Sequence, residues 1–152
     1  MKIGVLGYQG DVEEHISTIN SMSSPERKVS GIRVTKKLEI DLCDGLIIPG
    51  GESTTIYKLI LEYGLYDYIK EKAFDGFPVM GTCAGLIIIS AETGDQRVTG
   101  MNIIDVSIRR NAYGRQINSF IKDIDIKGIG TFPAVFIRAP VIESAGTADI
   151  LS

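Results

Sequence analysis

Cys83 is the residue of this sequence whose neighbours best suit nucleophilic chemistry. It lies in Gly81-Thr82-Cys83-Ala84-Gly85, between a short apolar run at residues 77–80 and a second apolar run at residues 86–89. This pattern predicts a buried strand that turns sharply into a helix, with the thiol at the bend. The glycines allow such a tight elbow, and the positive end of a helix favours the reactive thiolate. The alternative is an ordinary buried cysteine beside a helix.

A second glycine turn, Pro49-Gly50-Gly51-Glu52-Ser53, follows the continuous apolar run at residues 45–48. Ligands of open parallel sheets bind at the carboxyl ends of strands, so we expect this turn and the Cys83 turn to face one pocket. Backbone N–H groups from both turns would then stabilise the oxyanion that forms when a thiolate attacks a carbonyl. Alone, the glycine turn is a weak signal, because such turns also bind phosphate or simply reverse the chain.

The elements that must position these turns alternate along the chain as strands and helices. Such alternation predicts a parallel sheet with helices on both faces. Asp11 and Glu14 form the pattern of a capping box, which predicts the start of the first helix. The strands are predicted at residues 3–6, 31–34, 45–48 and 77–80, and the helices at residues 12–22, 54–63 and 65–74.

After residue 89 the hydrophobic pattern changes from continuous runs to alternation. Apolar and polar residues alternate at residues 104–109 and 123–127, which predicts half-exposed strands of antiparallel character. A further strand is expected at residues 135–138, closed by Pro140, and another is expected to begin at residues 148–151. No internal repeat or second domain is evident.

The length, composition and net charge of the sequence are typical of a compact soluble protein. A chain of 152 residues with 44% hydrophobic residues predicts one domain with a sizeable core. The net charge of −3 argues against a nucleic-acid partner. The N-terminal stretch lacks a leader pattern and no apolar run reaches membrane-spanning length, so we expect no membrane partner and a cytoplasmic location. Cys43 and Cys83 lack metal-ligand spacing, so neither a zinc site nor a disulfide is predicted, and Cys43 is expected to be structural.

Several motifs together resemble a known family. The Cys83 motif resembles the nucleophile motif of class I glutamine amidotransferases, which use a Cys-His-Glu triad to release ammonia from glutamine. With the other motifs, the sequence resembles the glutaminase subunits of pyridoxal 5'-phosphate synthase. The motifs that carry this narrower resemblance are Gly7-Tyr8-Gln9-Gly10 with Glu14-His15, residues 49–55, residues 110–116 and residues 136–140.

The resemblance implies a three-layer α/β, flavodoxin-like fold with a mostly parallel sheet. It implies that Cys83 forms a glutamyl thioester, with the backbone amides of Gly51 and Ala84 as oxyanion donors. No metal or organic cofactor is implied. The implied partner is a (β/α)8-barrel synthase subunit, which uses the ammonia to make pyridoxal 5'-phosphate (vitamin B6). The implied glutamine-binding residues are Gly51, Glu52, Ser53, Arg110, Ile137 and Arg138.

An arginine fork suits the α-carboxylate of an amino acid, which makes the implied roles of Arg110 and Arg138 chemically sensible. The alternative for both residues is an ordinary surface charge on an alternating strand.

The departure from the family concerns the base of the triad. The resemblance implies a histidine and a glutamate in a His-Pro-Glu-like motif near the C-terminus, but no histidine follows Cys83. We therefore expect a C-terminal segment to be missing and the chain as written to be nearly inactive, because the leaving ammonia needs a proton. His15, on the first helix, is disfavoured as a replacement base. The rival interpretations are a non-catalytic binding or regulatory subunit of the same fold, and another cysteine-elbow amidotransferase or hydrolase.

Overall fold

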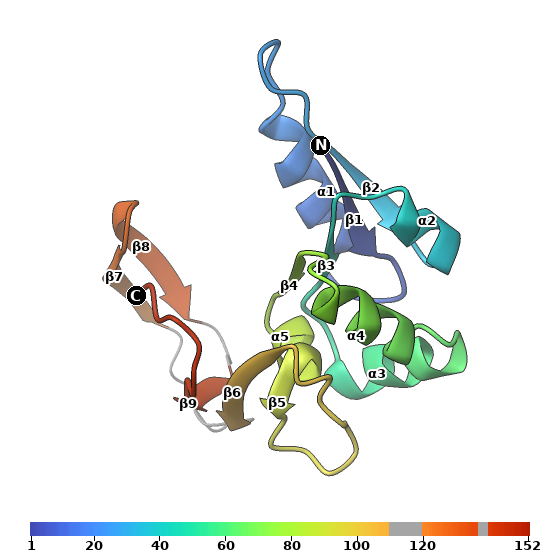
Figure 1. The fold of residues 1–152 in the computed structure, drawn as a ribbon. Coiled ribbons are helices and arrows are strands. Elements are labelled where there is room, and N and C mark those ends of the chain that lie inside the picture. Colours follow the sequence, from blue (N-terminus) through green and yellow to red (C-terminus); the bar gives the residue numbers. More distant parts are fainter. Residues whose placement is uncertain (110–119, 137–139) are drawn as a thin grey trace.

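A parallel four-stranded sheet is formed by strands between Lys2 and Gly81. The computed structural model describes residues 1–109, 120–136 and 140–152 (Figure 1). The strand order is β2-β1-β3-β4, and all three neighbouring pairs are parallel, so the carboxyl ends of the strands meet at one edge. The strands are β1 (Lys2–Leu6), β2 (Ser30–Val34), β3 (Gly45–Ile48) and β4 (Val79–Gly81).

Alternate side chains of the central strands are buried against helices on opposite faces of the sheet. Val5 and Ile47 pack in a small core with α1 (Val12–Ser21). Leu46 and Ile48, each one residue away from Ile47, belong to the larger core on the other face. The sequence-based prediction of a parallel sheet covered on both faces is confirmed. The helices that contribute to the larger core are α2 (Lys37–Asp41), α3 (Ser53–Glu62), α4 (Tyr66–Phe74) and α5 (Ala84–Ile89).

The later strands form two smaller sheets, in β5-β6-β9 and β7-β8 order. The pairs β6–β9 and β7–β8 are antiparallel, as the alternating pattern predicts, whereas β5 and β6 are parallel. Figure 1 shows the β7-β8 hairpin standing apart from the parallel sheet. The strands are β5 (Ser90–Glu92), β6 (Ile104–Arg109), β7 (Phe120–Ile126), β8 (Gly130–Phe136) and β9 (Val141–Ser144).

Two local predictions are wrong. The strand expected at residues 148–151 is a turn followed by irregular chain, in which the Ala148 N–H donates to the Ala145 carbonyl at 2.7 Å. The Asp11 capping box is also absent, because the Asp11 side chain makes no cap hydrogen bond. The Asp11 carboxylate instead lies beside Gly50, 2.9 Å from where a Cβ on that glycine would stand. Tertiary contact with the Gly50 turn has displaced the local cap.

Three short elements were not predicted. The elements α2, β5 and β9 contain between three and five residues each, which is too short for a hydrophobic period to be visible. Among the residues that the structure describes, no helix is long and apolar enough to cross a membrane.

Candidate active site

Cys83 occupies a strained backbone position between β4 and α5. Its φ is 47° and its ψ is −101°, a combination that residues with a side chain rarely adopt. Such strain costs on the order of 1–3 kcal/mol and persists where the surrounding structure imposes it, often at active sites. The residue is exposed to solvent. The strand, the sharp turn and the helix predicted around Cys83 are therefore all present.

The glycines on each side of Cys83 are required by close packing of the backbone. A Cβ on Gly85 would overlap the carbonyl oxygen of Ile48 at the end of β3. A Cβ on Gly81 would lie 2.5 Å from the backbone nitrogen of Leu86. Because neither position has room for a methyl group, these glycines let α5 begin directly against the strands β3 and β4.

The Cys83 turn and the Gly50 turn lie against each other, as predicted. A Cβ on Gly50 would stand 3.5 Å from the Cβ of Cys83, and the Thr82 N–H donates to the Ile48 carbonyl at 3.1 Å. A cavity of about 360 Å³ opens where the two turns meet the first helix. It is lined by Asp11, Glu14, His15, Thr18, Gly50, Thr82 and Cys83.

The loop after β1 supports the Gly50 turn. The Gly50 carbonyl accepts a hydrogen bond from the Asp11 N–H at 3.2 Å, and the Gln9 side-chain oxygen accepts one from the Glu52 N–H at 2.9 Å. Gly10, with a φ of 103°, has no room for a Cβ because that atom would overlap the Gly50 carbonyl oxygen. The residue types alone did not predict these contacts, although Gly7-Tyr8-Gln9-Gly10 was among the motifs of the resemblance.

Two backbone N–H groups and one hydroxyl at these turns have no partner among the residues that the structure describes. Within the described part of the chain, the amides of Gly51 and Ala84 donate no hydrogen bond. The hydroxyl of Ser53 is buried, with the residue 2% exposed, and it too has no partner among the described residues. Buried polar groups are normally satisfied, so an orphaned hydroxyl in the same turn as the unengaged Gly51 amide suggests a place for a polar ligand.

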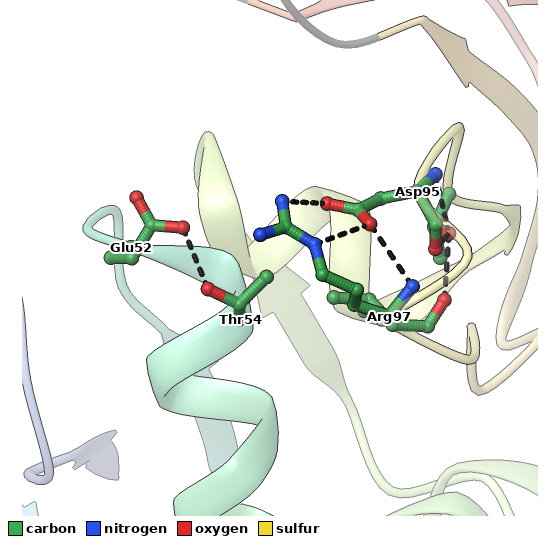
Figure 2. A network of polar contacts seen from close by, with 6 residues as sticks. Glu52, Thr54, Asp95 and Arg97 are labelled. Atoms are coloured by element: carbon green, nitrogen blue, oxygen red, sulfur yellow. Dashed lines mark hydrogen bonds and ion pairs between the residues drawn. The ribbon is translucent and has the colours of Figure 1, made fainter.

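Glu52 and Ser53 stand at the start of α3. Figure 2 shows the Glu52 carboxylate accepting a hydrogen bond from the Thr54 hydroxyl, at 2.8 Å. Glu52 is exposed, whereas the neighbouring Ser53 is buried. The two implied glutamine-binding residues thus combine a solvent-accessible carboxylate with a buried hydroxyl on one helix end.

The same view shows an ion pair that the sequence did not predict. Arg97 donates from Nε and Nη2 to the two carboxylate oxygens of Asp95, at 3.0 and 2.8 Å (Figure 2). The Asp95 side chain is only 8% exposed, so the fork of Arg97 compensates a nearly buried charge. An acidic and a basic residue separated by one position occur often in protein sequences. Their spacing alone therefore did not predict the ion pair between Asp95 and Arg97.

The remaining implied site residues, Arg110, Ile137 and Arg138, lie outside the described residues.

The other cysteine, Cys43, is half-buried, and its thiol donates to the Glu39 carbonyl at 3.3 Å. Burial raises the pKa of the Cys43 thiol above its ordinary value. Cys43 therefore has the features of a structural cysteine, in contrast to the exposed Cys83.

Comparison of the chain with known proteins shows the family to which it belongs. The model of the SNO glutamine amidotransferase family matches residues 5–152. The chain belongs to the SNO glutamine amidotransferase family. A "Pyridoxal 5'-phosphate synthase subunit PdxT" from Thermoplasma volcanium is 59% identical over 152 residues, which cover all of this chain and 76% of the relative. The protein of the same name from Picrophilus torridus is 53% identical over 99% of this chain and 78% of its own length.

The solved structures support the same assignment of fold. A crystal structure of a glutamine amidotransferase superposes with a TM-score of 0.82 at 38% sequence identity. The match covers 95% of this chain and 75% of that one. The predicted flavodoxin-like, class I glutamine amidotransferase fold of this SNO family member is confirmed.

Proposed function

We propose that the chain is a glutaminase, which hydrolyses L-glutamine to glutamate and ammonia through a thioester on Cys83. The observation that carries this proposal is the contact between the strained Cys83 turn and the Gly50 turn. It brings the turn of an exposed thiol against the Gly50 turn, and one backbone amide in each turn, that of Ala84 and that of Gly51, donates no hydrogen bond within the described residues. The family of the chain consists of glutamine amidotransferases, which supports the choice of substrate.

The reaction begins when the Cys83 thiolate attacks the carbonyl carbon of the glutamine side-chain amide. A carbon–sulfur bond forms, and the carbonyl electron pair moves onto the oxygen. The N–H groups of Gly51 and Ala84 are the donors for this oxyanion, and removing one such donor typically costs about 3 kcal/mol of transition-state stabilisation. The intermediate collapses as the carbon–nitrogen bond breaks and the nitrogen takes up a proton that comes ultimately from solvent, so that ammonia leaves. Water then attacks the thioester, which releases glutamate, protons and the regenerated Cys83 thiolate.

The substrate's other groups are assigned by charge and by burial. The Glu52 carboxylate suits the α-ammonium of glutamine, and the orphaned Ser53 hydroxyl would gain the partner that it lacks. Arg110, Ile137 and Arg138 keep their proposed roles in binding glutamine, the arginines at its α-carboxylate. No residue of the described site is assigned as the proton donor for ammonia, because the implied histidine and glutamate are not among these 152 residues.

The destination of the ammonia follows from the relatives. These relatives are named as subunits of pyridoxal 5'-phosphate synthase, so we propose that the chain supplies ammonia to the (β/α)8-barrel synthase subunit for vitamin B6 synthesis. These names do not favour the alternative of a non-catalytic regulatory subunit. We place the reaction in the cytoplasm, where two unpaired cysteines remain reduced.

Covalent trapping tests the glutaminase proposal on these residues, because it requires the nucleophile and the substrate pocket but no turnover. The chain is incubated with an electrophilic diazoketone analogue of glutamine, and the modified residue is located by peptide mass spectrometry. We expect modification of Cys83, protection by L-glutamine, and no labelling of Cys83→Ser. Cys43 serves as the internal control. Equal labelling of both cysteines, or labelling that L-glutamine does not slow, would contradict the proposal.

Co-elution with the synthase subunit tests the partner. We expect a stable complex on size-exclusion chromatography between this chain and the barrel subunit encoded in the same genome. Separate elution of the two proteins, with and without L-glutamine, would overturn the proposed assembly while leaving the glutaminase proposal intact.

A further inference from the structure

The side chain of His15 reaches the turn that carries the nucleophile. His15 lies in the first turn of α1, and its Nε2 atom is 3.1 Å from the hydroxyl oxygen of Thr82, 67 residues further along the chain. Both side chains are half-buried and line the cavity beside Cys83. Among the described residues, no other side-chain hydrogen bond joins α1 to this turn. The contact thus links a helix on one face of the sheet to the residue that directly precedes the nucleophile.

Thr82 is held at two points. Its backbone N–H donates to the Ile48 carbonyl at 3.1 Å, which ties the turn to the end of β3. Its hydroxyl is paired with His15, which ties the same residue to α1. Cys83 follows directly and has a φ of 47°, a conformation that relaxes unless its neighbours hold it. Fixing Thr82 from both sides is therefore a means of keeping the Cys83 backbone in its strained form.

The same geometry argues against His15 as the general base. The Nε2 atom is engaged with the Thr82 hydroxyl, and no hydrogen bond between His15 and the Cys83 thiol occurs in the described residues. A base must lie within hydrogen-bond reach of the proton that it removes. The observed contact suits support of the turn.

We infer that His15 is a positioning residue, which acts through Thr82 to hold the Cys83 turn in its reactive conformation. The inference rests on the proposed function only for the identity of the substrate, since the contact itself is independent of glutamine. Loss of one net hydrogen bond changes an equilibrium by about three- to tenfold, and that is the size of effect expected here.

Inactivation by the diazoketone analogue of glutamine tests the inference, because its limiting rate and its half-saturating concentration can be measured separately. We expect His15→Ala and Thr82→Val each to lower the limiting rate of Cys83 labelling about three- to tenfold, with the half-saturating concentration unchanged. The double variant is expected to be no slower than the slower single variant, because both changes remove one interaction.

Conservative variants and a matched control separate positioning from general structural damage. Glutamine can place a side-chain nitrogen near the Nε2 position, so His15→Gln is expected to recover the rate to within about twofold, as is Thr82→Ser. Ser21→Ala is the control, since Ser21 lies on the same helix, outside the cavity beside Cys83, and its hydroxyl bonds only within α1 in the described structure. It is expected to leave the rate unchanged. A His15→Gln variant as slow as His15→Ala would show that an ionising imidazole is required and would overturn the positioning role.

Amide hydrogen exchange keeps this test independent of the proposed function. We expect exchange at residues 81–86 to accelerate about three- to tenfold in His15→Ala and in Thr82→Val, and to stay unchanged in Ser21→Ala. If the analogue fails to label the unaltered chain, the glutaminase proposal fails, but the exchange rates still decide the role of His15. Unchanged exchange in both variants would overturn the inference.

Discussion

The side-chain oxygen of Gln9 accepts a hydrogen bond from the backbone N–H of Glu52, 2.9 Å away. The bond joins the loop after β1 to the start of α3 and holds the turn that contains Gly50 and Gly51. Because the Gly51 amide belongs to this turn, its direction depends on a residue that is 42 positions earlier in the chain. One of the two proposed oxyanion donors, the Gly51 amide, thus belongs to a turn that the loop after β1 supports.

Removing the Gln9 side chain is expected to slow the trapping of Cys83. In Gln9→Ala the Glu52 N–H loses its acceptor and the Gly50 turn loses one of its two links to the β1 loop. We expect a three- to tenfold lower labelling rate with the diazoketone analogue, from the loss of about one net hydrogen bond. Gln96→Ala, at an exposed position in the loop after β5, is the control. Equal rates for the two variants would refute this role.

Ser53→Ala is expected to separate stability from binding. The Ser53 hydroxyl is buried without a partner, so its removal should leave the free energy of unfolding unchanged or raise it by up to about 1 kcal/mol. If the hydroxyl bonds glutamine, the same change weakens protection of Cys83 by L-glutamine about three- to tenfold. Urea unfolding and the protection assay measure the two effects. A clear loss of stability with unchanged protection would assign Ser53 a structural role.

Gly85→Ala is expected to destabilise the chain strongly. The new methyl group would overlap the Ile48 carbonyl, which cannot move without disturbing β3, so we expect a loss of about 3 kcal/mol. Gly64→Ala is the comparison, because Gly64 has a φ of 65° but nothing within 4 Å of a Cβ. Gly64→Ala should lower the free energy of unfolding by only about 1 kcal/mol, which is the cost of a left-handed backbone conformation for a residue with a side chain. Urea midpoints measure both, and equal losses would contradict the packing argument.

Tyr8 is expected to ionise later than an ordinary tyrosine. Burial, with smaller contributions from Tyr63 and Glu39, raises the pKa of Tyr8 from 10.0 to about 12. The pKa of Tyr8 is higher in the folded chain than in the unfolded chain, where it is near 10.0. The preference of the fold for the neutral phenol therefore contributes its full amount to the free energy of unfolding below pH 10, and this contribution is lost as the pH rises through about 12. Burial also raises the pKa of Tyr66 and of Tyr68 above the ordinary value. Ultraviolet titration should therefore show late phenolate ionisation whose amplitude near pH 12 becomes smaller in Tyr8→Phe. An unchanged amplitude in that variant would contradict the assignment.

The two cysteines are expected to differ in reactivity with a small alkylating agent. Cys43 is half-buried and burial raises its thiol pKa, so little thiolate is available near pH 7. Cys83 is exposed at a sharp turn. We expect iodoacetamide to modify Cys83 first, and Cys43 to react faster as the pH rises above 9. Peptide mass spectrometry at several pH values measures both rates, and prior modification of Cys43 would contradict the expectation.

Much of the fold and part of the site could be predicted from local sequence. The continuous apolar runs of β1 and β3 and the small residues around Cys83 indicated a parallel sheet with an elbow, because these patterns depend on neighbours within a few positions. The pairing of the Cys83 and Gly50 turns also followed, since parallel strands end at the same edge of a sheet. The family resemblance added the identities of glutamine-binding residues, which spacing alone does not contain.

Only the tertiary structure decided how these turns are held. The contacts from Gln9 to Glu52 and from His15 to Thr82 join residues 43 and 67 positions apart, and no local pattern encodes such pairs. Asp11 shows the same limit, because its spacing to Glu14 predicted a helix cap while packing placed its carboxylate beside Gly50. Local propensities contribute a fraction of a kcal/mol, so a single long-range contact is enough to redirect a side chain. The sequence therefore determined which chemistry is present, and packing between distant segments decided its geometry.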